Sequence, residues 1–308
     1  MATGGDELQI GENGSSLPAV CVIVPHYSDL ANLSRCLDAL ERQAYPRDRF
    51  DVIVVDNGSP EGERAALDAI RGRARLLIAL ESGAASARNA GVAASSAAIL
   101  AFTDSDCTPE PGWLEAGVRA LSQFSLVGGC VSVLVRDPER MTGVEAFERV
   151  FAFDNRSYVT TKGFSVTANL FCDRRLFEIV GGFRPGVPED LDWCRRVRAA
   201  GYRLGYEPKA IVGHPARQTW RELIAKWRRL NAEAFGLSMT KPGGRLIWLA
   251  RSLALPVSAL IHTPRALVSR DLTTRSQRLS ALGILYRLRL WRFRDGLSRL
   301  MGAGAQAR

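Results

Sequence analysis

The sequence predicts an α/β protein with a mostly parallel sheet flanked by helices, followed by a basic helical extension. Short apolar runs alternate with segments of helical periodicity in its N-terminal third, which is the spacing of βαβ units. Polar turn residues follow several of these runs. The 308 residues carry a net charge of +9, and the excess of basic residues falls in the C-terminal third. Together these features favour an α/β domain that carries a separate basic region.

The first strands and helices follow from local composition. Leu30, Leu33, Leu37 and Leu40 have helical spacing, and the apolar run before them ends at Pro25. Strands are expected at 18–25, 50–55, 74–80 and 98–102, and helices at 30–43, 61–70 and 84–93. Ligands of such sheets bind beyond the carboxyl ends of the strands. The polar clusters at 26–29, 56–59 and 104–106 are therefore expected to converge on one edge.

The pattern of the next hundred or so residues is less regular. We expect helices at 111–124, 174–180 and 189–200, strands at 126–135 and 168–171, and short strands reaching His214. The acidic first turn of the helix at 189–200 suits the positive end of a helix dipole. Residues 143–165 show no pattern that favours one element.

Charge and cysteine content divide the chain and indicate its compartment. Residues 215–308 contain 18 Lys and Arg against 4 Asp and Glu, which suggests an anionic partner surface. We expect a flexible tail at 1–17, a catalytic domain at 18–214 with donor and acceptor halves at 18–107 and 108–214, and a basic helical region at 215–308. The six cysteines form no Cys-x-x-Cys pair, and no signal peptide is recognisable. A cytoplasmic protein is expected.

Asp104-Ser105-Asp106 follows the apolar run at 98–102 and carries the strongest chemical signal. Two carboxylates one residue apart repel each other unless a cation lies between them. Hard divalent cations prefer oxygen ligands and often complete their coordination with substrate phosphates. An ordinary surface turn with Asp residues is the alternative. The surrounding motifs favour a metal site.

Taken in order, these motifs resemble those of family 2 glycosyltransferases of the GT-A fold, over roughly residues 18–215. They comprise Val24–Tyr27, Val54–Ser59, Ser86–Gly91, Phe102–Asp106, Gly181–Phe183, Glu189–Cys194 and Gly201-Tyr202. The resemblance implies an inverting enzyme that uses Mn²⁺ or Mg²⁺. Such an enzyme moves a sugar from a nucleotide-sugar donor to a hydroxyl of an acceptor.

The resemblance also implies which residues bind the donor. Asp106 would be the main metal ligand, and Asp104 would contact the metal or the ribose, with Ser105 between them. The other implied donor-binding residues are Pro25, His26, Tyr27, Asp56 and Arg88. An exposed arginine on a helix is the alternative interpretation of Arg88.

By the same resemblance, Asp190 is the general base that removes the proton of the acceptor hydroxyl, and Glu189 orients the acceptor. The alternative is that these carboxylates, with Asp192, only stabilise a helix N-terminus. Asp192, Trp113 and Trp193 are candidate acceptor contacts, although both indoles could belong to the core. His214 is either a further metal ligand or a structural residue.

The basic region contains a predicted amphipathic helix at 219–230 and a 16-residue apolar stretch at 246–261, interrupted by Arg251 and Pro256. We expect an interfacial or re-entrant element there, because the stretch is short for a membrane span. Peripheral attachment to the inner face of the cell membrane would bring a lipid-linked or cell-envelope glycan acceptor within reach. Alternatively, the apolar face of the helix at 219–230 packs on the catalytic domain. The alternating apolar and arginine residues at 286–294 have no explanation from the sequence.

Two other functions compete with the transferase. A nucleotidyltransferase would also pair carboxylates with a metal and a nucleotide, but it would leave Glu189-Asp190 without a role. A nucleic-acid-binding protein could use the basic region, although no helix-turn-helix, zinc or stacking pattern is present, so no nucleic acid partner is expected. The donor base, sugar, acceptor, linkage, processivity and oligomeric state are not predicted.

Overall fold

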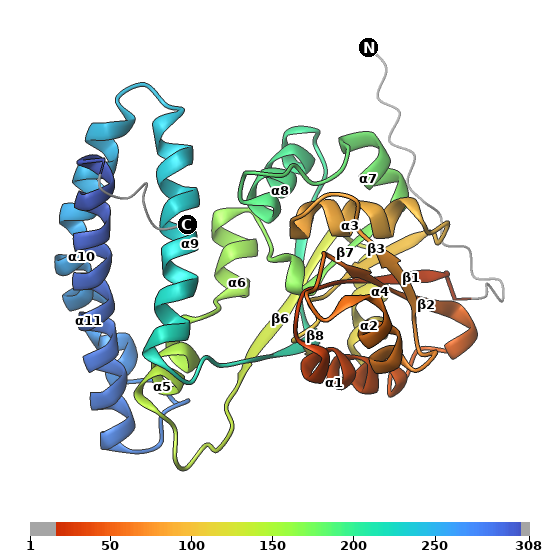
Figure 1. Ribbon diagram of the computed structural model, residues 1–308, viewed down its shortest axis with the longest axis horizontal. Helices are drawn as coiled ribbons and strands as arrows, with labels where there is room; N and C mark the ends of the chain where they lie inside the picture. Colours follow the sequence, from red (N-terminus) through yellow and green to blue (C-terminus); the bar gives the residue numbers. More distant parts are fainter. Residues whose placement is uncertain (1–16, 303–308) are drawn as a thin grey trace. The chain divides into compact units, whose positions relative to one another are not determined.

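The computed structural model describes residues 17–302, which form two compact units (Figure 1). Unit 1 contains the chain up to Cys130, Asn155–Phe183 and Trp193–Val212. Unit 2 contains Val131–Asp154, Arg184–Asp192 and the chain from Gly213 onward. Nearly all of the predicted N-terminal tail, residues 1–16, lies outside the described residues.

The sheet has the strand order β3-β2-β1-β4-β7-β6-β8-β5. Its strands are β1 (Val20–His26), β2 (Phe50–Asp56), β3 (Arg75–Ile78), β4 (Ile99–Phe102), β5 (Thr108–Pro109), β6 (Leu126–Leu134), β7 (Leu170–Asp173) and β8 (Leu204–Pro215). The strands β1 to β4 pair in parallel, whereas β7 is antiparallel to both β4 and β6. The sheet is therefore mixed, and the expected parallel pairing holds only for its first half.

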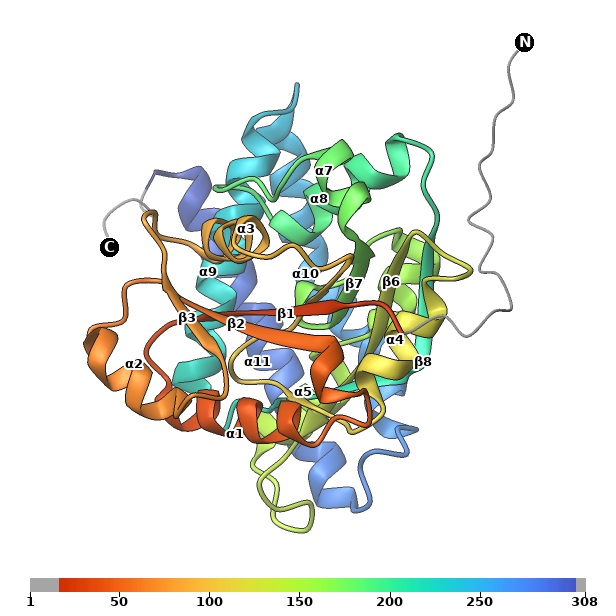
Figure 2. The same cartoon turned by 90° about the vertical axis from the view of Figure 1, so that its right-hand side faces the viewer.

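Helices cover both faces of the sheet in unit 1. They are α1 (Leu30–Glu41), α2 (Gly62–Ile70), α3 (Ala84–Ala93), α4 (Trp113–Ala120), α6 (Asn155–Ser157) and α7 (Arg174–Val180), and α8 (Glu189–Ala199) crosses the unit boundary in its first turn. Short 3₁₀ turns lie at Arg47–Arg49 and Thr167–Asn169, and a π-helical turn at Tyr158–Lys162. Figure 2 shows α1 and α3 on opposite sides of β1.

Every residue of β1 is buried, as expected for a strand covered on both faces. Val22 and Val24 pack with α1 on one face, and Ile23 packs with α3 on the other. Gly91 permits the close approach of α3, because a Cβ atom there would lie 2.6 Å from the Ile23 side chain. This packing fixes the carboxyl ends of β1 and β2 beneath the N-terminus of α3.

The second half of the chain departs from the predictions in detail. The strand expected at 168–171 is β7, shifted toward the C-terminus by two residues, and the short strands expected before His214 are the single strand β8. Residues 143–165, which gave no prediction, begin with helix α5 (Gly143–Phe151). A capping box between Thr142 and Glu145 starts α5.

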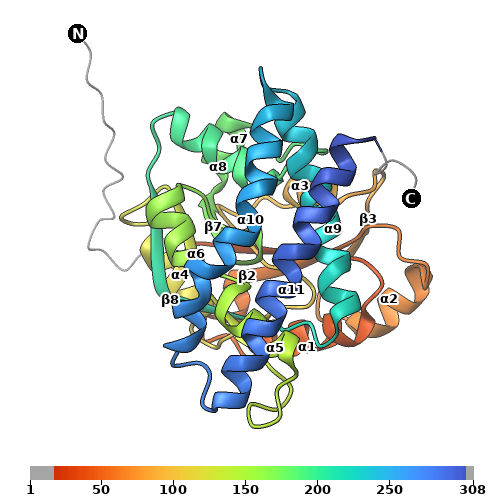
Figure 3. The same cartoon turned by 90° about the vertical axis from the view of Figure 1, so that its left-hand side faces the viewer.

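Unit 2 is mainly helical. Besides α5, it contains α9 (Trp220–Met239), α10 (Gly244–Leu267) and α11 (Arg275–Leu300), which share an apolar core (Figure 3). The apolar stretch predicted as a short interrupted element is instead part of a 24-residue helix, and Pro256 lies inside α10 without ending it. Within residues 17–302, only α10 has the length and apolar composition that a membrane span requires.

The arginines of α11 stack on aromatic side chains inside unit 2. The Arg287 guanidinium lies 4.1 Å from the ring centre of Trp220, and that of Arg292 lies 4.0 Å from Trp227. Arg292 Nε also donates to Asn231 Oδ1 at 3.2 Å. Cation–π packing against α9 therefore accounts for two arginines of the alternating stretch, Arg287 and Arg292.

Candidate active site

The acidic motif of unit 1 forms a tight turn directly after β4. The backbone N–H of Cys107 donates to the Asp104 carbonyl at 3.0 Å, which closes the turn. Side-chain ligand atoms of Asp104, Asp106 and Cys107 lie within 4.8 Å of one another. The turn therefore brings both carboxylates to one place at the carboxyl edge of the sheet.

Arg88 of α3 reaches this turn. Its Nη2 lies 2.6 Å from Asp104 Oδ1, and its side chain is only 4% exposed. The exposed-arginine interpretation is thus wrong, because the guanidinium is buried against the acidic motif. The ion pair partly neutralises Asp104, and it holds α3 and the β4 turn together where a nucleotide is expected.

The donor set of this turn fits a hard divalent cation. The two carboxylates supply oxygen ligands, and both residues are partly exposed. Burial raises the pKa of the Cys107 thiol well above its usual value, so Cys107 stays neutral and is a poor ligand for such a cation. Asp106 and Asp104 are therefore the residues that would hold a metal ion.

The neighbouring loops continue the same edge. His26 and Asp56 are paired across β1 and β2, and both are buried. Burial lowers the pKa of His26 despite the nearby Asp56 charge, so the imidazole is neutral near pH 7. Asp56 Oδ1 accepts from the Ser59 N–H at 2.8 Å. Tyr27 is 61% exposed and is available to a ligand.

Hydrogen bonds between loops keep this edge in shape. The Ser28 N–H donates to Ser59 Oγ at 2.9 Å, and the Gly83 N–H donates to Asn57 Oδ1 at 2.8 Å. The loops after β1, β2 and β3 are thus linked in series. In unit 1 the structure brings together every predicted donor-binding segment at one edge.

Asn89, which follows Arg88 on α3, joins two motifs that are far apart in the sequence. Its Nδ2 donates to the Phe183 carbonyl at 2.8 Å, and its Oδ1 accepts from the Phe183 N–H at 2.9 Å. A Cβ atom at Gly182 would lie 2.6 Å from Asn89 Oδ1, so the turn needs glycine there. Asn89 was missed as a site residue, and only its place in the Ser86–Gly91 motif could have signalled it.

The two candidate sugar-stacking tryptophans belong to the core. Trp113 and Trp193 are both fully buried. Trp113 Nε1 donates to Asn169 Oδ1 at 2.9 Å, and Trp193 Nε1 donates to the Gly181 carbonyl at 2.8 Å. The prediction of acceptor contacts for these residues is wrong, because neither ring has an exposed face on which a sugar could stack.

The acidic residues of α8 that precede Trp193 belong to unit 2. Asp192 Oδ1 lies 3.8 Å from Arg184 Nη1, an ion pair within unit 2. Glu233 of α9 has a raised pKa, caused first by burial and also by the negative charge of Glu189. Glu189 and Asp190 thus lie at a carboxylate-rich place in unit 2. Glu233 was missed, because its segment carries no motif.

His214 lies at the end of β8 in unit 2 and is largely buried. Its Nδ1 lies 2.9 Å from the Pro215 carbonyl, which can only accept, so Nδ1 carries the proton. With the proton on Nδ1, Nε2 is the ring nitrogen that a metal would use. The imidazole packs 4.8 Å from the ring of Phe153.

A buried charge network lies beside Phe153. Glu148 Oε1 is 3.2 Å from both Lys226 Nζ and Arg217 Nη1, and Lys226 also lies over the Phe153 ring at 5.3 Å. Burial opposes ionisation of Glu148, but Lys226 and Arg217 outweigh it and lower its pKa. The network fixes the segment after His214 to α5, and no sequence motif indicated it.

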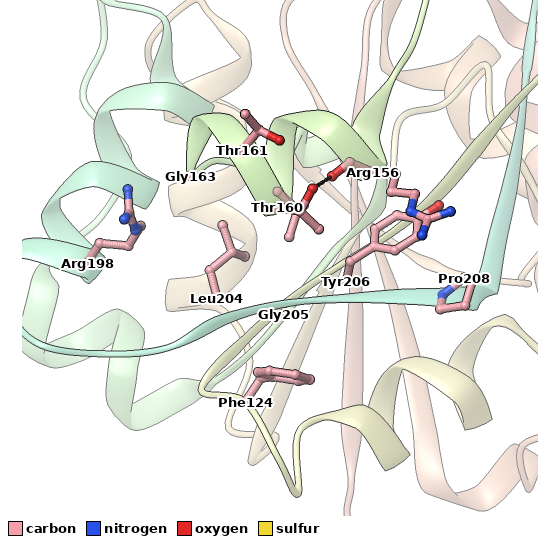
Figure 4. Close-up of a pocket in the computed structure, with 11 residues that line it drawn as sticks. Phe124, Arg156, Thr160, Thr161, Gly163, Arg198, Leu204, Gly205, Tyr206 and Pro208 are labelled. Carbon is pink, nitrogen blue, oxygen red and sulfur yellow. Dashed lines mark hydrogen bonds between the residues drawn. The ribbon is translucent and has the colours of Figure 1, made fainter.

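A separate open cavity of about 640 Å³ lies in unit 1 (Figure 4). Its lining comprises Phe124, Arg156, Val159, Thr160, Thr161, Gly163, Arg198, Leu204, Gly205, Tyr206 and Pro208. Phe124 comes shortly before β6. The first residue of β6 pairs with Cys172 of β7, and Cys172 also pairs with Leu100 near the start of β4. Phe124 thus lies toward the end of the sheet opposite Asp104, and no predicted site residue lines the cavity.

Comparisons with known proteins agree with this arrangement. The family model described as Glycosyl transferase family 2 matches residues 21–180. The glycosyltransferase AglE of Haloferax volcanii is 36% identical over 224 residues, which is 70% of this chain and 73% of that protein. A pre-mycofactocin glycosyltransferase of Mycobacterium tuberculosis is 29% identical over 293 residues, and the match spans 89% of this chain but only 61% of that protein.

A solved structure supports the fold. The crystal structure of GalNAc-T7 with UDP, GalNAc and Mn²⁺ superposes with a TM-score of 0.52 at 16% identity, over 65% of this chain and 44% of that one. At this identity the likeness concerns the fold alone. The mixed sheet with flanking helices is thus the GT-A fold.

Proposed function

Because the chain belongs to glycosyl transferase family 2, we propose that it is an inverting, metal-dependent enzyme that transfers a sugar from a nucleotide-sugar donor to an acceptor hydroxyl. One observation carries the proposal: Asp104 and Asp106 share a tight turn at the carboxyl edge of β4, with Arg88 paired to Asp104 at 2.6 Å. A nucleotide diphosphate needs cationic groups at this position.

The donor side of the reaction depends on charge. A divalent cation held by Asp106 and Asp104 would stabilise the negative charge that develops on the leaving diphosphate. Arg88 keeps the Asp104 carboxylate in place, and the linked loops after β1 and β2 hold the ribose and base near Asp56 and Tyr27. The GT-A structure that contains UDP and Mn²⁺ makes Mn²⁺ the first metal to test.

The acceptor side needs a base. Direct displacement inverts the anomeric centre, and the attacking hydroxyl loses its proton as the new bond forms. We assign the removal of this proton to Asp190, which follows Glu189 in unit 2, and the charge of Glu189 also acts on Glu233. His214 Nε2 is assigned as a further contact of the metal or the diphosphate.

The acceptor is proposed to be a lipid-linked or cell-envelope glycan, reached from the cytoplasmic face of the membrane. The basic residues of the C-terminal region and the apolar helix α10 support this assignment. The nucleotidyltransferase alternative is disfavoured, because it leaves the carboxylates of α8 and α9 without a role.

The test is a panel of UDP-, GDP- and dTDP-sugars, incubated with the full chain in the presence of Mn²⁺, Mg²⁺ or EDTA. We expect metal-dependent release of the nucleoside diphosphate from one donor class. Asp106→Ala should reduce this release by at least about 100-fold, since charge stabilisation of the leaving group is lost.

Arg71→Ala is the matched control, because Arg71 lies at the end of α2, outside the donor edge. It should release the nucleotide at the wild-type rate. Metal-independent release, or unchanged release by Asp106→Ala, would contradict the proposed donor site. Release of pyrophosphate from a nucleoside triphosphate would instead favour the nucleotidyltransferase.

A further inference from the structure

Helix α10 exposes large aliphatic side chains along its whole length. Eight such residues are at least 44% exposed, namely Leu246, Ile247, Leu253, Val257, Leu260, Ile261, Leu267 and Val268. A helix turns by about 100° per residue, so most of them gather on one side of α10. We call these residues the outer face of α10. A helix on a water-facing surface would carry polar residues there.

The opposite side of α10 carries Trp248 and several small residues, and it is already occupied. Ser252, Ala259 and Ala266 are buried. Trp248 Nε1 donates to the Gly296 carbonyl of α11 at 3.0 Å, and a Cβ atom at Gly296 would lie 2.4 Å from Ser252 Oγ. The close packing of α10 on α11 therefore uses one face and leaves the outer face unpartnered within unit 2.

The outer face continues onto α11. Thr263 Oγ1 and the Tyr286 hydroxyl are 2.9 Å apart, which joins the two helices near the end of α10. On α11, Leu279, Tyr286 and Leu290 are 67%, 40% and 45% exposed. Figure 3 shows α10 and α11 side by side along their length. The exposed apolar surface thus spans two neighbouring helices.

The charges around this surface are basic. The exposed Arg245, Arg251 and Arg265 belong to α10, and the helix contains no Asp or Glu. Arg265 pairs with Asp154 at 3.3 Å, which leaves Arg245 and Arg251 as basic charges without a carboxylate on their own helix. Two copies of the same surface would bring these arginines together, which disfavours self-association. An anionic lipid bilayer supplies both the apolar interior and the negative headgroups that such a surface needs.

We propose that the outer face of α10, extended by the exposed residues of α11, docks on an anionic bilayer with both helices parallel to the membrane plane. The spanning alternative is disfavoured by α11, whose arginines lie along its whole length and would enter the hydrocarbon region with α10. The inference deepens the proposed function, on which it rests only for the identity of the acceptor.

Vesicle sedimentation with the full chain tests the docking surface. Wild-type protein should sediment with phosphatidylcholine vesicles that contain phosphatidylglycerol, and more weakly with phosphatidylcholine alone. The triple variant Leu253→Gln, Val257→Gln, Leu260→Gln should lose at least about tenfold in affinity, because it removes apolar surface that would be buried in lipid. These side chains are exposed, so circular dichroism should remain that of the wild type.

The matched control changes exposed aliphatic residues of unit 1. Leu67→Gln with Ile179→Gln should sediment like the wild type, since neither residue lies in unit 2. Equal vesicle binding by the triple variant would overturn the proposal. If the wild type forms a dimer, the triple variant is a monomer and neither binds vesicles, the surface belongs to an interface with a second copy. This outcome would also overturn the proposal.

Label depth tests the orientation. An environment-sensitive fluorophore is attached to the new cysteine of the variants Leu246→Cys, Val257→Cys and Val268→Cys. Its quenching by lipids brominated at shallow or deep positions reports its depth in the bilayer. The wild type treated with the same label corrects for labelling of the partly exposed Cys130. Similar shallow depth at all three sites is expected. A deep centre with shallow ends would overturn the in-plane orientation in favour of a span.

Donor hydrolysis, measured on the same preparations, separates the two proposals. Vesicle binding without any nucleotide-sugar hydrolysis would leave the docking surface standing and would contradict the proposed function. Hydrolysis of a nucleotide sugar without vesicle binding would support the proposed function and would contradict the docking surface.

Discussion

Unit 1 and unit 2 place their charged and apolar side chains in opposite ways. In unit 1 the strands and the inner sides of the helices are apolar, and the carboxylates gather at the carboxyl edge of the sheet. In unit 2 several charges are buried, such as Glu148 and Arg292, while the outer face of α10 presents aliphatic residues to the outside. The first arrangement suits a ligand site in water, and the second suits a surface that is not fully in water.

The two units also hold their charges differently. Arg88 in unit 1 pairs with the Asp104 carboxylate beside the expected ligand site. In unit 2, Glu148 is shared by Lys226 and Arg217, and arginines stack on tryptophans. Buried charges need partners or stacking to offset the loss of water. The buried charges Glu148 and Arg292 of unit 2 therefore serve packing, whereas the Arg88–Asp104 pair of unit 1 lies beside the proposed donor site.

The largest expected effect separates donor binding in unit 1 from proton removal in unit 2. Asp190→Asn should lower sugar transfer by about 10²–10⁴-fold, since a general base contributes that much. Donor affinity, measured by calorimetry with the nucleoside diphosphate and Mn²⁺, should stay unchanged. Transfer is measured with the labelled donor and a total membrane lipid extract as acceptor.

Asp192→Asn is the control for Asp190, because Asp192 already pairs with Arg184. It should cost about 0.3–1 kcal/mol of stability at most, as expected for a charge at a helix N-terminus. If Asp190→Asn transfers sugar as fast as Asp192→Asn, the base is another residue.

The next effect concerns the stability of unit 2. Glu148→Gln should destabilise it by about 3–5 kcal/mol, because Lys226 and Arg217 would lose the carboxylate that compensates them. Urea unfolding followed by tryptophan fluorescence measures this change. The unit 1 comparison is Asp38→Asn at the partly exposed ion pair with Arg73, which should cost less than about 1 kcal/mol. Equal costs would mean that the buried network contributes no more than a surface pair.

Two helical glycines should respond to alanine with opposite signs. Gly117→Ala in α4 of unit 1 should destabilise by about 1–3 kcal/mol, because the new Cβ would lie 2.3 Å from the Phe171 ring. Gly236→Ala in α9 of unit 2 meets nothing within 4 Å and should stabilise by about 0.5–1 kcal/mol. Thermal unfolding of both variants provides the measurement. A stable Gly117→Ala protein would show that the α4–β7 contact can relax.

The smallest effect is a difference in acid sensitivity. Burial lowers the pKa of His26 in unit 1 below the value of about 6.5 that it has in the unfolded chain. The contribution of neutral His26 to folding stability is therefore complete above about pH 6.5 and declines as the pH falls below that value. The pKa of Glu148 in unit 2 is lowered by its two cations, so that contribution persists down to about pH 4.5 and is lost below. Hydrogen exchange at pH 5.5 should increase first in β1.

His26→Asn should remove the acid sensitivity of β1 between about pH 6.5 and 5, because no imidazole remains to be protonated. Peptides from α5 and α9 provide the reference for unit 2. Earlier opening of α5 than of β1 on acidification would contradict the assignment of these two groups.

The sequence predicted most elements of unit 1 and the residues of its carboxyl edge. Apolar runs such as that of β1 and the spacing of Leu33 and Leu37 are local patterns, and local patterns determine where strands and helices form. The turn at Asp104 and Asp106 follows a strand end, so its position on the sheet edge could also be predicted. The family motif implied that Arg88 binds the donor, but only the structure shows that its buried guanidinium pairs with Asp104.

Tertiary structure alone decided the rest. Trp113 and Trp193 were ambiguous, because an indole suits both a core and a sugar site until its neighbours are known. Glu148, Lys226 and Arg217 are separated in the sequence, and only folding brings them together. By itself the sequence determined the order of the strands and helices up to β4, the basic C-terminal region and the acidic turn. Which arginines stack inside unit 2, and which aliphatic face of α10 remains outside, depends on helix packing, because a side chain's burial is set by the surfaces that surround it.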